Sequence, residues 1–405
     1  LKPLISWQNP YPYYPFTREE LDRFFPGRDL EEVSEEKTLS WFTEDGAHYM
    51  TGDKEELTER PAGHIIATRA FGPASDRLIA STNYIYGVFN SLLSFGNTQF
   101  NRLLTYKKTP LNILKTSGQR LFVKIDGAYR LLALPAVYRV AVNSAAWYYK
   151  IADDVLVIET AAAANAPRVA LSVRSLKGRA YDFIFTSELS LGEIEGVYPV
   201  EYEISGTAVA FRFPKAALAG KIYPEYSFRM ELNAPGNVRF YGDEIFFPDE
   251  SAGSPVLAAR IDGAAGFSAE IKGVIGADAA EAGAGSDIDA MRAEYEKLHR
   301  EDLNGFSLSI SPDNENYREV KKINYLAYWY LHNALIHYAV PHGLEQYGGG
   351  AWGTRDVCQG PAEMFSALKR YDLTRKIILA VYGRQFYETG DWPQWFMFDR
   401  YRFIQ

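Results

Sequence analysis

Residues 137–159 read VYRVAVNSAAWYYKIADDVLVIE, and this stretch decides the fold class. It contains three short runs in which β-branched and aromatic residues dominate: Val137–Val142, Ala146–Ile151 and Val155–Glu159. The residues between the runs are rich in Asn, Ser and Asp, which are typical of tight turns. Runs of this composition at this spacing favour antiparallel strands over strand–helix–strand units.

The same pattern extends in both directions, from Arg120 to about Gly276. Turn residues return about every 8 to 15 positions, which predicts a large antiparallel β-sandwich. We find no catalytic constellation within it and interpret it as a structural or accessory domain. Further strand-like runs are Leu121–Ile125, Val169–Val173, Tyr181–Phe185, Val209–Phe213, Phe228–Leu232 and Val238–Tyr241.

The residues before the sandwich predict little regular structure. Residues 1–45 combine turns with one short helix, for which Thr17 and Glu20 form a capping-box pattern. The stretch from His48 to Gly63 is polar and reads as a loop.

The composition changes after the sandwich. Residues 277–286 are rich in Ala and Gly, which is typical of a linker, and Ser286 is placed to begin a helix. Phe306–Ile310 alternates apolar and polar residues and predicts a short strand. We therefore expect a sandwich domain over 1–276 and a linker with a helix over 277–310.

Residues 311–405 have a helical pattern. Apolar residues recur at helical spacing from Val320 to Tyr338 and also occupy the opposite side, which predicts a helix buried on all sides. Such a helix fits a toroid of helical hairpins. Two further helices are expected over Ala362–Arg370 and Leu373–Tyr387.

The loop Pro341–Pro361 reads PHGLEQYGGGAWGTRDVCQGP and is the strongest candidate for a binding site. Four of the six residues from Gly348 to Gly353 are glycines, which disfavours helix and strand. The glycines also match Gly-x-Gly-x-x-Gly, but a nucleotide-binding loop follows a strand, whereas a helix precedes this one. Candidate ligand-binding residues in the loop are Glu345, Gln346, Trp352, Thr354, Arg355, Asp356 and Gln359.

Arg355 and Asp356 are the most informative pair. A carboxylate can accept hydrogen bonds from two neighbouring sugar hydroxyls, while a guanidinium donates in a fixed fork. Trp352 could stack on the same sugar ring. An ion pair that braces a glycine-rich turn explains the pair equally well. Asp391 and Trp392 form a second sugar-like cluster, although core packing of the aromatic residues is slightly favoured there.

Bulk properties restrict the function. The net charge of −8 argues against nucleic acid, and no run of 18 apolar residues predicts a membrane helix. The single cysteine, Cys358, excludes an internal disulfide, is interpreted as a buried thiol and suggests a cytoplasmic protein. His332, His337 and His342 are spaced too widely to share one helix face, so we expect no metal and no organic cofactor.

Three segments, His332–Tyr338, Gly343–Tyr347 and Trp352–Pro361, together resemble the catalytic domain of glycoside hydrolase family 94. Gly96–Arg102 and Asp391–Asp399 fit the subgroup that acts on β-1,2-linked oligoglucans. The resemblance implies an N-terminal β-sandwich, a linker helix and an (α/α)6 barrel, of which 311–405 would be the start.

Family chemistry, as the resemblance implies it, is reversible inverting phosphorolysis. Phosphate attacks the anomeric carbon of the terminal glucose, one Asp acts as general acid, and α-glucose 1-phosphate leaves. Arg355 and Asp356 take the role of binding the glucose that is removed. Relatives that act on cellobiose carry a second Asp where this chain has Gly360, which favours the β-1,2 subgroup.

The family's general acid and phosphate-binding residues lie well beyond the Arg-Asp pair, so we expect them after Gln405 and expect this chain to be an inactive N-terminal fragment. The expected ligands are β-1,2-glucooligosaccharides and phosphate, and the family commonly forms homodimers. Two alternatives stay open: a glycoside hydrolase of the same architecture, and a non-catalytic glucan-binding protein.

Overall fold

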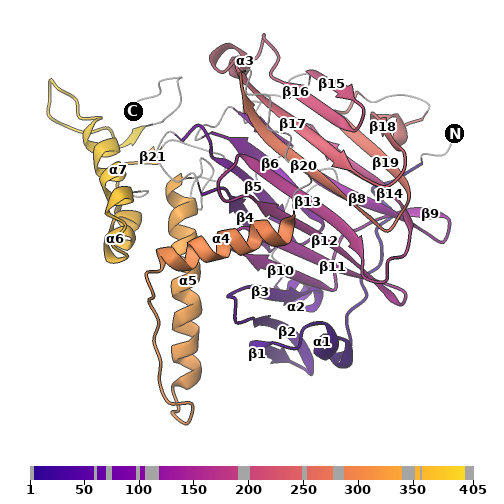
Figure 1. Ribbon diagram of the computed structural model, residues 1–405, viewed down its shortest axis with the longest axis horizontal. Coiled ribbons are helices and arrows are strands. Elements are labelled where there is room, and N and C mark those ends of the chain that lie inside the picture. Colours follow the sequence, from indigo (N-terminus) through magenta and orange to yellow (C-terminus); the bar gives the residue numbers. More distant parts are fainter. Residues whose placement is uncertain are drawn as a thin grey trace.

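A computed structural model describes residues 4–58, 62–69, 75–96, 101–104, 118–189, 201–248, 253–276, 287–339, 352–355 and 358–396. Within these ranges a large antiparallel β structure comes first, and helices follow it (Figure 1). The largest sheet has 11 strands in the order β1-β2-β3-β10-β11-β12-β13-β20-β17-β16-β15. Their bounds, in chain order, are β1 Asp29–Ser34, β2 Lys37–Phe42, β3 His48–Thr51, β10 Val137–Ala141, β11 Ser144–Ile151, β12 Asp154–Ala162, β13 Arg168–Ser175, β15 Glu201–Ser205, β16 Ala208–Arg212, β17 Tyr226–Asn233 and β20 Gly266–Ile275.

Three smaller sheets accompany the largest one. A five-stranded sheet has the order β18-β19-β14-β8-β9, a four-stranded sheet the order β4-β5-β6-β7, and β21 pairs with β22. Their bounds are β4 Gly63–Ala67, β5 Ile79–Tyr84, β6 Val88–Phe95, β7 Arg102–Leu103, β8 Gln119–Ile125, β9 Ala128–Leu131, β14 Tyr181–Glu188, β18 Val238–Tyr241, β19 Val256–Ala264, β21 Trp352–Gly353 and β22 Trp395–Phe396.

The core lies between the 11-stranded and five-stranded sheets. Phe267 of β20 packs its ring 5.6 Å from the rings of both Phe183 and Phe185 of β14. All three side chains are at most 5% exposed and belong to one large apolar cluster. Two antiparallel sheets with their apolar faces together confirm the predicted β-sandwich.

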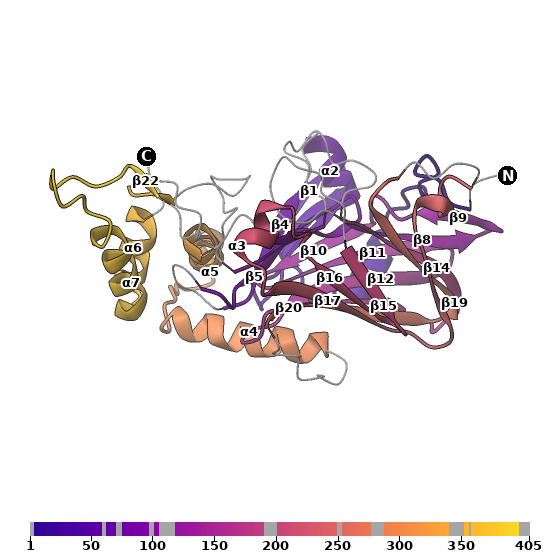
Figure 2. The same cartoon turned by 90° about the horizontal axis from the view of Figure 1, so that it is seen from above.

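Helices α5, α6 and α7 lie at one side of the sandwich and α4 crosses its face, whereas α1, α2 and α3 lie elsewhere around the sheets (Figures 1 and 2). Within the described residues they are α1 Arg18–Phe24, α2 Gly52–Thr58, α3 Leu218–Ile222, the 3-10 helix η2 Asp243–Ile245, α4 Ile288–Asp302, α5 Tyr317–Ala339, α6 Gln359–Ala367 and α7 Tyr371–Tyr382. The (α/α)6 barrel stays a prediction, because only α5, α6 and α7 are described in that part of the chain.

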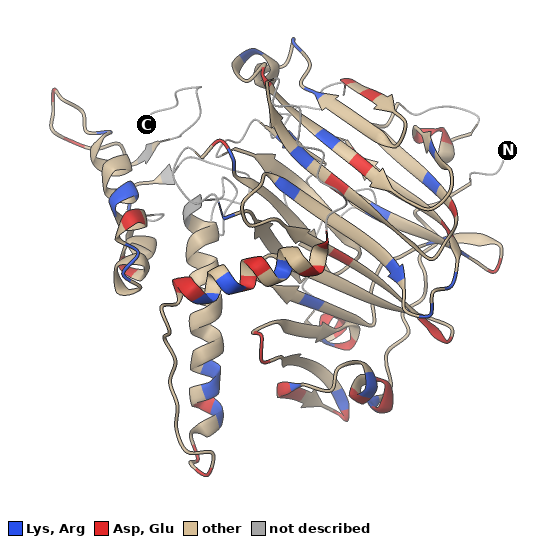
Figure 3. Cartoon of the chain, in the orientation of Figure 1, with Lys and Arg blue, Asp and Glu red and all other residues tan. Residues whose placement is uncertain are grey.

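Helix α4 crosses the outer face of the large sheet, and charged residues occur along its length (Figure 3). Met291 packs in one apolar cluster with Ala161 of β12 and Ala170 of β13. Beside this cluster, Glu159 of β12 accepts a hydrogen bond from Arg292 of α4 at 2.9 Å. The linker helix is therefore fixed to the sandwich by apolar and ionic contacts together.

Helix α5 runs along the edge of the sandwich. The indole N–H of Trp329 donates to the carbonyl oxygen of Gly46 at 3.0 Å, and Ile336 packs against the ends of β4 and β5. Leu331 and Leu335 are buried, whereas Tyr330 is 60% exposed. The prediction that this helix is buried on all sides is therefore wrong. Among the residues that the structure describes, only one side of α5 is covered by other parts of the chain.

Several local predictions failed and one was confirmed. Residues 1–45, expected to combine turns with one short helix, also contain the strands β1 and β2, and the helix expected over Leu373–Tyr387 ends at Tyr382. Residues 306–310 form no strand, because Leu308 pairs its N–H and C=O with the side chain of Asn324 instead of a neighbouring strand. The expected loop from His48 to Gly63 contains β3 and α2. The capping box of α1 is present, with reciprocal hydrogen bonds between Thr17 and Glu20.

Candidate functional site

The two loops that the sequence singled out separately lie together. Trp352 and Gly353 form β21, which pairs antiparallel with Trp395 and Phe396 of β22. The Thr354 N–H donates to the carbonyl oxygen of Gln394 at 2.9 Å, and its hydroxyl donates to the carbonyl oxygen of Pro393 at 2.6 Å. The two segments that carry the candidate sugar-binding clusters therefore lie side by side.

The first loop leads directly into helix α6. The Gln359 N–H donates to the carbonyl oxygen of Arg355 at 3.0 Å, which forms the first helical turn. The side chains of Arg355 and Gln359 are both exposed. A guanidinium and a carboxamide therefore lie exposed at the start of one helix, and both are groups that can hydrogen-bond to a ligand.

The second loop is a closed turn after helix α7. The Phe386 N–H donates to the carbonyl oxygen of Asp391 at 2.8 Å, and the Asp391 side chain is exposed. Trp392 is 40% exposed and packs edge-to-face on Tyr382, with the ring centroids 5.4 Å apart. The sequence-based interpretation that slightly favoured core packing is therefore wrong for Asp391 and Trp392, because both side chains are exposed.

Three of the predicted site residues, Glu345, Gln346 and Asp356, lie outside the described residues, and so does His342. Of Trp352, only the backbone in β21 is described. The structure therefore brings Thr354, Arg355, Gln359, Asp391 and Trp392 into one region and leaves the predicted Arg-Asp pair untested.

An apolar cluster packs β22 against helices α6 and α7. Phe396 is 1% exposed and packs in one cluster with Cys358, Phe365 of α6 and Leu373 of α7. Burial raises the pKa of the Cys358 thiol to about 12. The interpretation of Cys358 as a buried thiol is confirmed, because a thiol with this pKa stays protonated and unreactive near neutral pH.

An ionic junction that was not predicted from the sequence joins the helices of the candidate site to the sandwich. Asp302, at the end of α4, binds Arg69, which follows β4, and Arg370, which precedes α7. The Asp302 side chain is 10% exposed. Because these three residues are far apart in the chain, no spacing pattern could have identified the junction.

The buried histidines behave as core residues. The His332 ring lies 5.2 Å from His64 and 5.6 Å from Trp329. Burial holds the pKa of His332 well below its usual value and lowers that of His64 to about 4. Among the described residues no group of His, Cys, Asp and Glu has the geometry to hold a metal ion.

The family model for the glycoside phosphorylase supersandwich domain matches residues 25–273. The chain therefore belongs to the glycoside phosphorylases that carry this domain.

One curated relative and several solved structures resemble the chain. It is 34% identical over 388 residues to the 1,2-β-oligoglucan phosphorylase of Listeria innocua, a match that covers 95% of this chain and 34% of the relative. The chain thus spans about a third of the length of the curated relative it matches.

The solved structures are more distant. A family GH92 α-mannosidase from Bacteroides thetaiotaomicron has 12% identity and a TM-score of 0.33, covering 73% of this chain and 40% of its own. A putative kojibiose phosphorylase from the human microbiome has 7% identity and a TM-score of 0.26, covering 88% and 42%. TM-scores this low do not establish a common fold.

A search for a membrane-spanning helix gave a negative result. None of the described helices combines the length and the apolar composition that crossing a bilayer requires.

Proposed function

We propose that the protein to which this chain belongs phosphorolyses β-1,2-linked oligoglucans and releases α-D-glucose 1-phosphate. The observation that carries this proposal is the 34% identity, over 95% of this chain, to a relative named for that activity. The supersandwich family match supports the same class of reaction. Inorganic phosphate is the co-substrate, and no organic cofactor or metal is required.

In the proposed reaction a phosphate oxygen forms a bond to the anomeric carbon of the terminal glucose. The bond between that carbon and the glycosidic oxygen breaks, and a general acid protonates the leaving oxygen. Attack from the opposite face converts the β-glucoside into the α-phosphate, so the reaction inverts configuration. Because phosphate replaces water and its base, one protein carboxylate suffices, in contrast to the two of a hydrolase.

Arg355, Asp356 and Trp352 are proposed to hold the glucose that is transferred, and Glu345 and Gln346 to extend that subsite. The pairing of β21 with β22 supports adding Asp391 and Trp392 to the same subsite, because it brings their loop beside Thr354. The general acid is proposed to lie after Gln405. We further propose a cytoplasmic location, domain boundaries at residues 276 and 310, and assembly as a homodimer.

The test measures glucose 1-phosphate released from β-1,2-glucooligosaccharides, with and without phosphate. It uses this chain and the chain extended to its natural stop codon. Release that requires phosphate and occurs only in the extended chain supports the proposal. Turnover without phosphate identifies a hydrolase, and saccharide binding without turnover in either form identifies a binding protein. Release by this chain alone would place the general acid within residues 1–405.

A further inference from the structure

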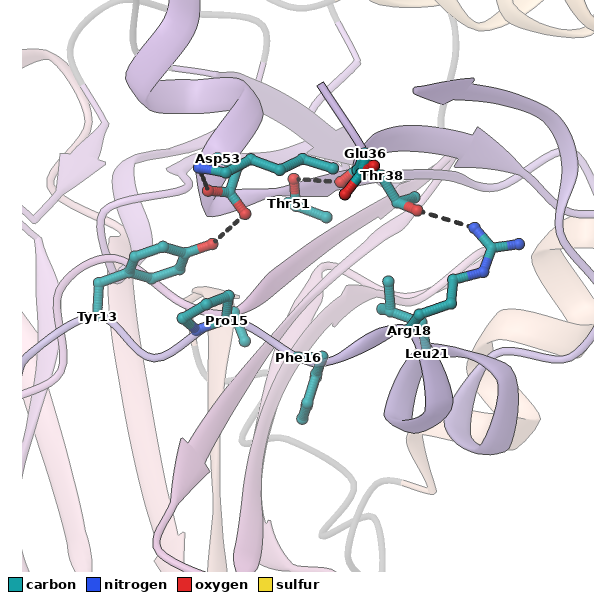
Figure 4. Close-up of a pocket in the computed structure, with 11 residues that line it drawn as sticks. Tyr13, Pro15, Phe16, Arg18, Leu21, Glu36, Thr38, Thr51 and Asp53 are labelled. Atoms are coloured by element: carbon teal, nitrogen blue, oxygen red, sulfur yellow. Dashed lines mark hydrogen bonds and ion pairs between the residues drawn. The ribbon is translucent and has the colours of Figure 1, made fainter. Parts of the chain in front are cut away.

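A small cavity in the N-terminal part of the sandwich has the chemistry of a saccharide site. Its volume is about 200 Å³, and it lies between the segment that precedes α1 and the strands β2 and β3 (Figure 4). In Figure 1 this part of the molecule is well separated from β21, α6 and α7. The cavity is therefore distinct from the candidate site described above.

One wall of the cavity carries the Asp53 carboxylate, which two neighbouring side chains hold in place. Asp53 accepts a hydrogen bond from the Tyr13 hydroxyl at 3.1 Å and pairs with Lys37 at 2.8 Å, using a different carboxylate oxygen for each. Each carboxylate oxygen can accept two hydrogen bonds, so both keep one free acceptor position. Two adjacent acceptors on one fixed carboxylate match two neighbouring hydroxyl groups of a sugar ring.

A second polar group faces the same space. The Thr38 hydroxyl accepts a hydrogen bond from the Arg18 guanidinium at 3.0 Å, and Thr51 donates to the Thr38 carbonyl oxygen at 3.0 Å. Both cations that line the cavity are paired, Lys37 with Asp53 and Arg18 with Glu31 at 2.7 Å, and a further carboxylate, Glu36, also lines it. A cavity with paired cations and spare hydrogen-bonding positions favours a neutral polyhydroxylated ligand over an anion such as phosphate.

A further wall, which faces Thr38 and Thr51, contains the ring of Tyr13, whose hydroxyl reaches Asp53 of the polar wall. Figure 4 shows Tyr13 and Pro15 across the cavity from Thr38 and Thr51. The Tyr13 ring rests directly on Gly52, where an added Cβ would lie 2.4 Å from the ring. Burial, with Asp53 beside the hydroxyl, raises the pKa of Tyr13 far above its ordinary value, so the phenol stays protonated and keeps donating. An aromatic face opposite hydrogen-bonding groups suits a pyranose, whose ring carbons are apolar.

The volume limits the size of the ligand. Pockets that enclose a whole drug-sized ligand measure about 300–1,000 Å³, and this cavity, at about 200 Å³, is smaller. Its size therefore fits a single sugar ring better than several.

We propose that this cavity binds a single hexopyranosyl unit of a glucan chain and serves as a second saccharide site, separate from the site of phosphorolysis. The inference rests on the proposed function for the identity of the sugar. Such a site would keep a long glucan attached to the sandwich while its end is processed elsewhere.

The experiment is a calorimetric titration of this 405-residue chain with a β-1,2-linked glucotriose. Arg355→Ala serves as the background, so that binding at the candidate site is weakened and the cavity dominates. Adding Asp53→Asn is expected to weaken the remaining binding at least tenfold. Adding Glu56→Gln is the matched control, because it removes a carboxylate from the same helix outside the cavity, and it is expected to leave binding unchanged.

Each outcome decides between the two proposals. If Asp53→Asn has no effect, or if the Arg355→Ala chain binds no saccharide, the cavity is not a saccharide site, whatever the phosphorolysis assay shows. If Asp53-dependent binding persists while the extended chain fails to release glucose 1-phosphate, the proposed function is wrong and the cavity stands. Tyr13→Phe keeps the aromatic wall and removes one anchor of Asp53. It provides a second test should Asp53→Asn fail to fold, with a smaller loss of affinity expected.

Discussion

Replacing Asp302 with Asn should loosen the helices that carry the candidate site while the sandwich stays intact. Asp302 binds Arg69 through one carboxylate oxygen and Arg370 through the other, so a single side chain joins the sandwich, α4 and the start of α7. Asparagine keeps the shape but removes the charge, and it turns an amide N–H₂ toward one of the two guanidinium groups.

The expected size follows from how buried each partner is. Removing one member of a fully buried ion pair costs about 3–5 kcal/mol, whereas exposed pairs contribute about 0–1 kcal/mol. The Arg69 side chain is 10% exposed, but that of Arg370 is 29% exposed and keeps its contact with Asp372. We therefore expect a cost between these limits, about 2–4 kcal/mol.

Native-state hydrogen exchange measures this cost separately in each region. At about 1.4 kcal/mol per tenfold, amides of α6 and α7 should lose roughly 30- to 700-fold in protection. Amides in β11 and β12 should change little. The control is Asp372→Asn, which removes the 57%-exposed partner of the same Arg370 and should have a small effect. Equal losses in the helices and in the sheet, or a change in α7 no larger than that of the control, would refute this reasoning.

Three further results are expected. Glu159→Gln should lower the free energy of unfolding by about 3–5 kcal/mol in urea, because Arg139 is 3% exposed and would lose its buried partner; a loss below about 1 kcal/mol would contradict this. Cys358 should not react with a thiol reagent at pH 8 in the native protein and should react fully in denaturant, since burial raises its pKa to about 12; rapid native labelling would disprove its burial. Burial raises the pKa of Glu55 to about 7, from an ordinary 4.5. The unfolded chain therefore releases this proton at lower pH, so Glu55 should reduce stability as pH rises from 4.5 to 7, and Glu55→Gln should remove that slope in pH-dependent melting.

Local chemistry made part of this structure predictable. The capping box joins Thr17 and Glu20, which are three residues apart, so the sequence spacing alone predicts its hydrogen bonds. The strands over residues 119–241 were predictable for a similar reason, since alternation and turn residues repeat within each hairpin. In contrast, Phe306–Ile310 has the alternation of a strand but pairs with no strand among the described residues. The side chain of Asn324 instead forms hydrogen bonds to its backbone, at Leu308.

The candidate site was predictable only in composition. Both loops contain the acidic, amide and aromatic residues that bind sugars, but nothing in the sequence indicates that Gly353 pairs with Trp395. That pairing depends on α6 and α7 packing through Phe365, Leu373 and Ile377, which is a tertiary property. The Tyr13–Asp53 cavity was missed for the same reason, because its walls come from segments about 40 residues apart.

Ion pairs join the helices to the sandwich beside the apolar contacts, and they bear on how the site is oriented. Asp29 of β1 accepts from Tyr325 and pairs with Lys321 of α5, while Asp302 and Glu159 form two further ionic attachments. Ion pairs fix register and direction more than they add stability. Salt should weaken the Asp29 pair, whose partner Lys321 is 35% exposed, and should affect the buried carboxylates much less. The orientation of α6 and α7 should therefore persist at high ionic strength, because it depends on Asp302.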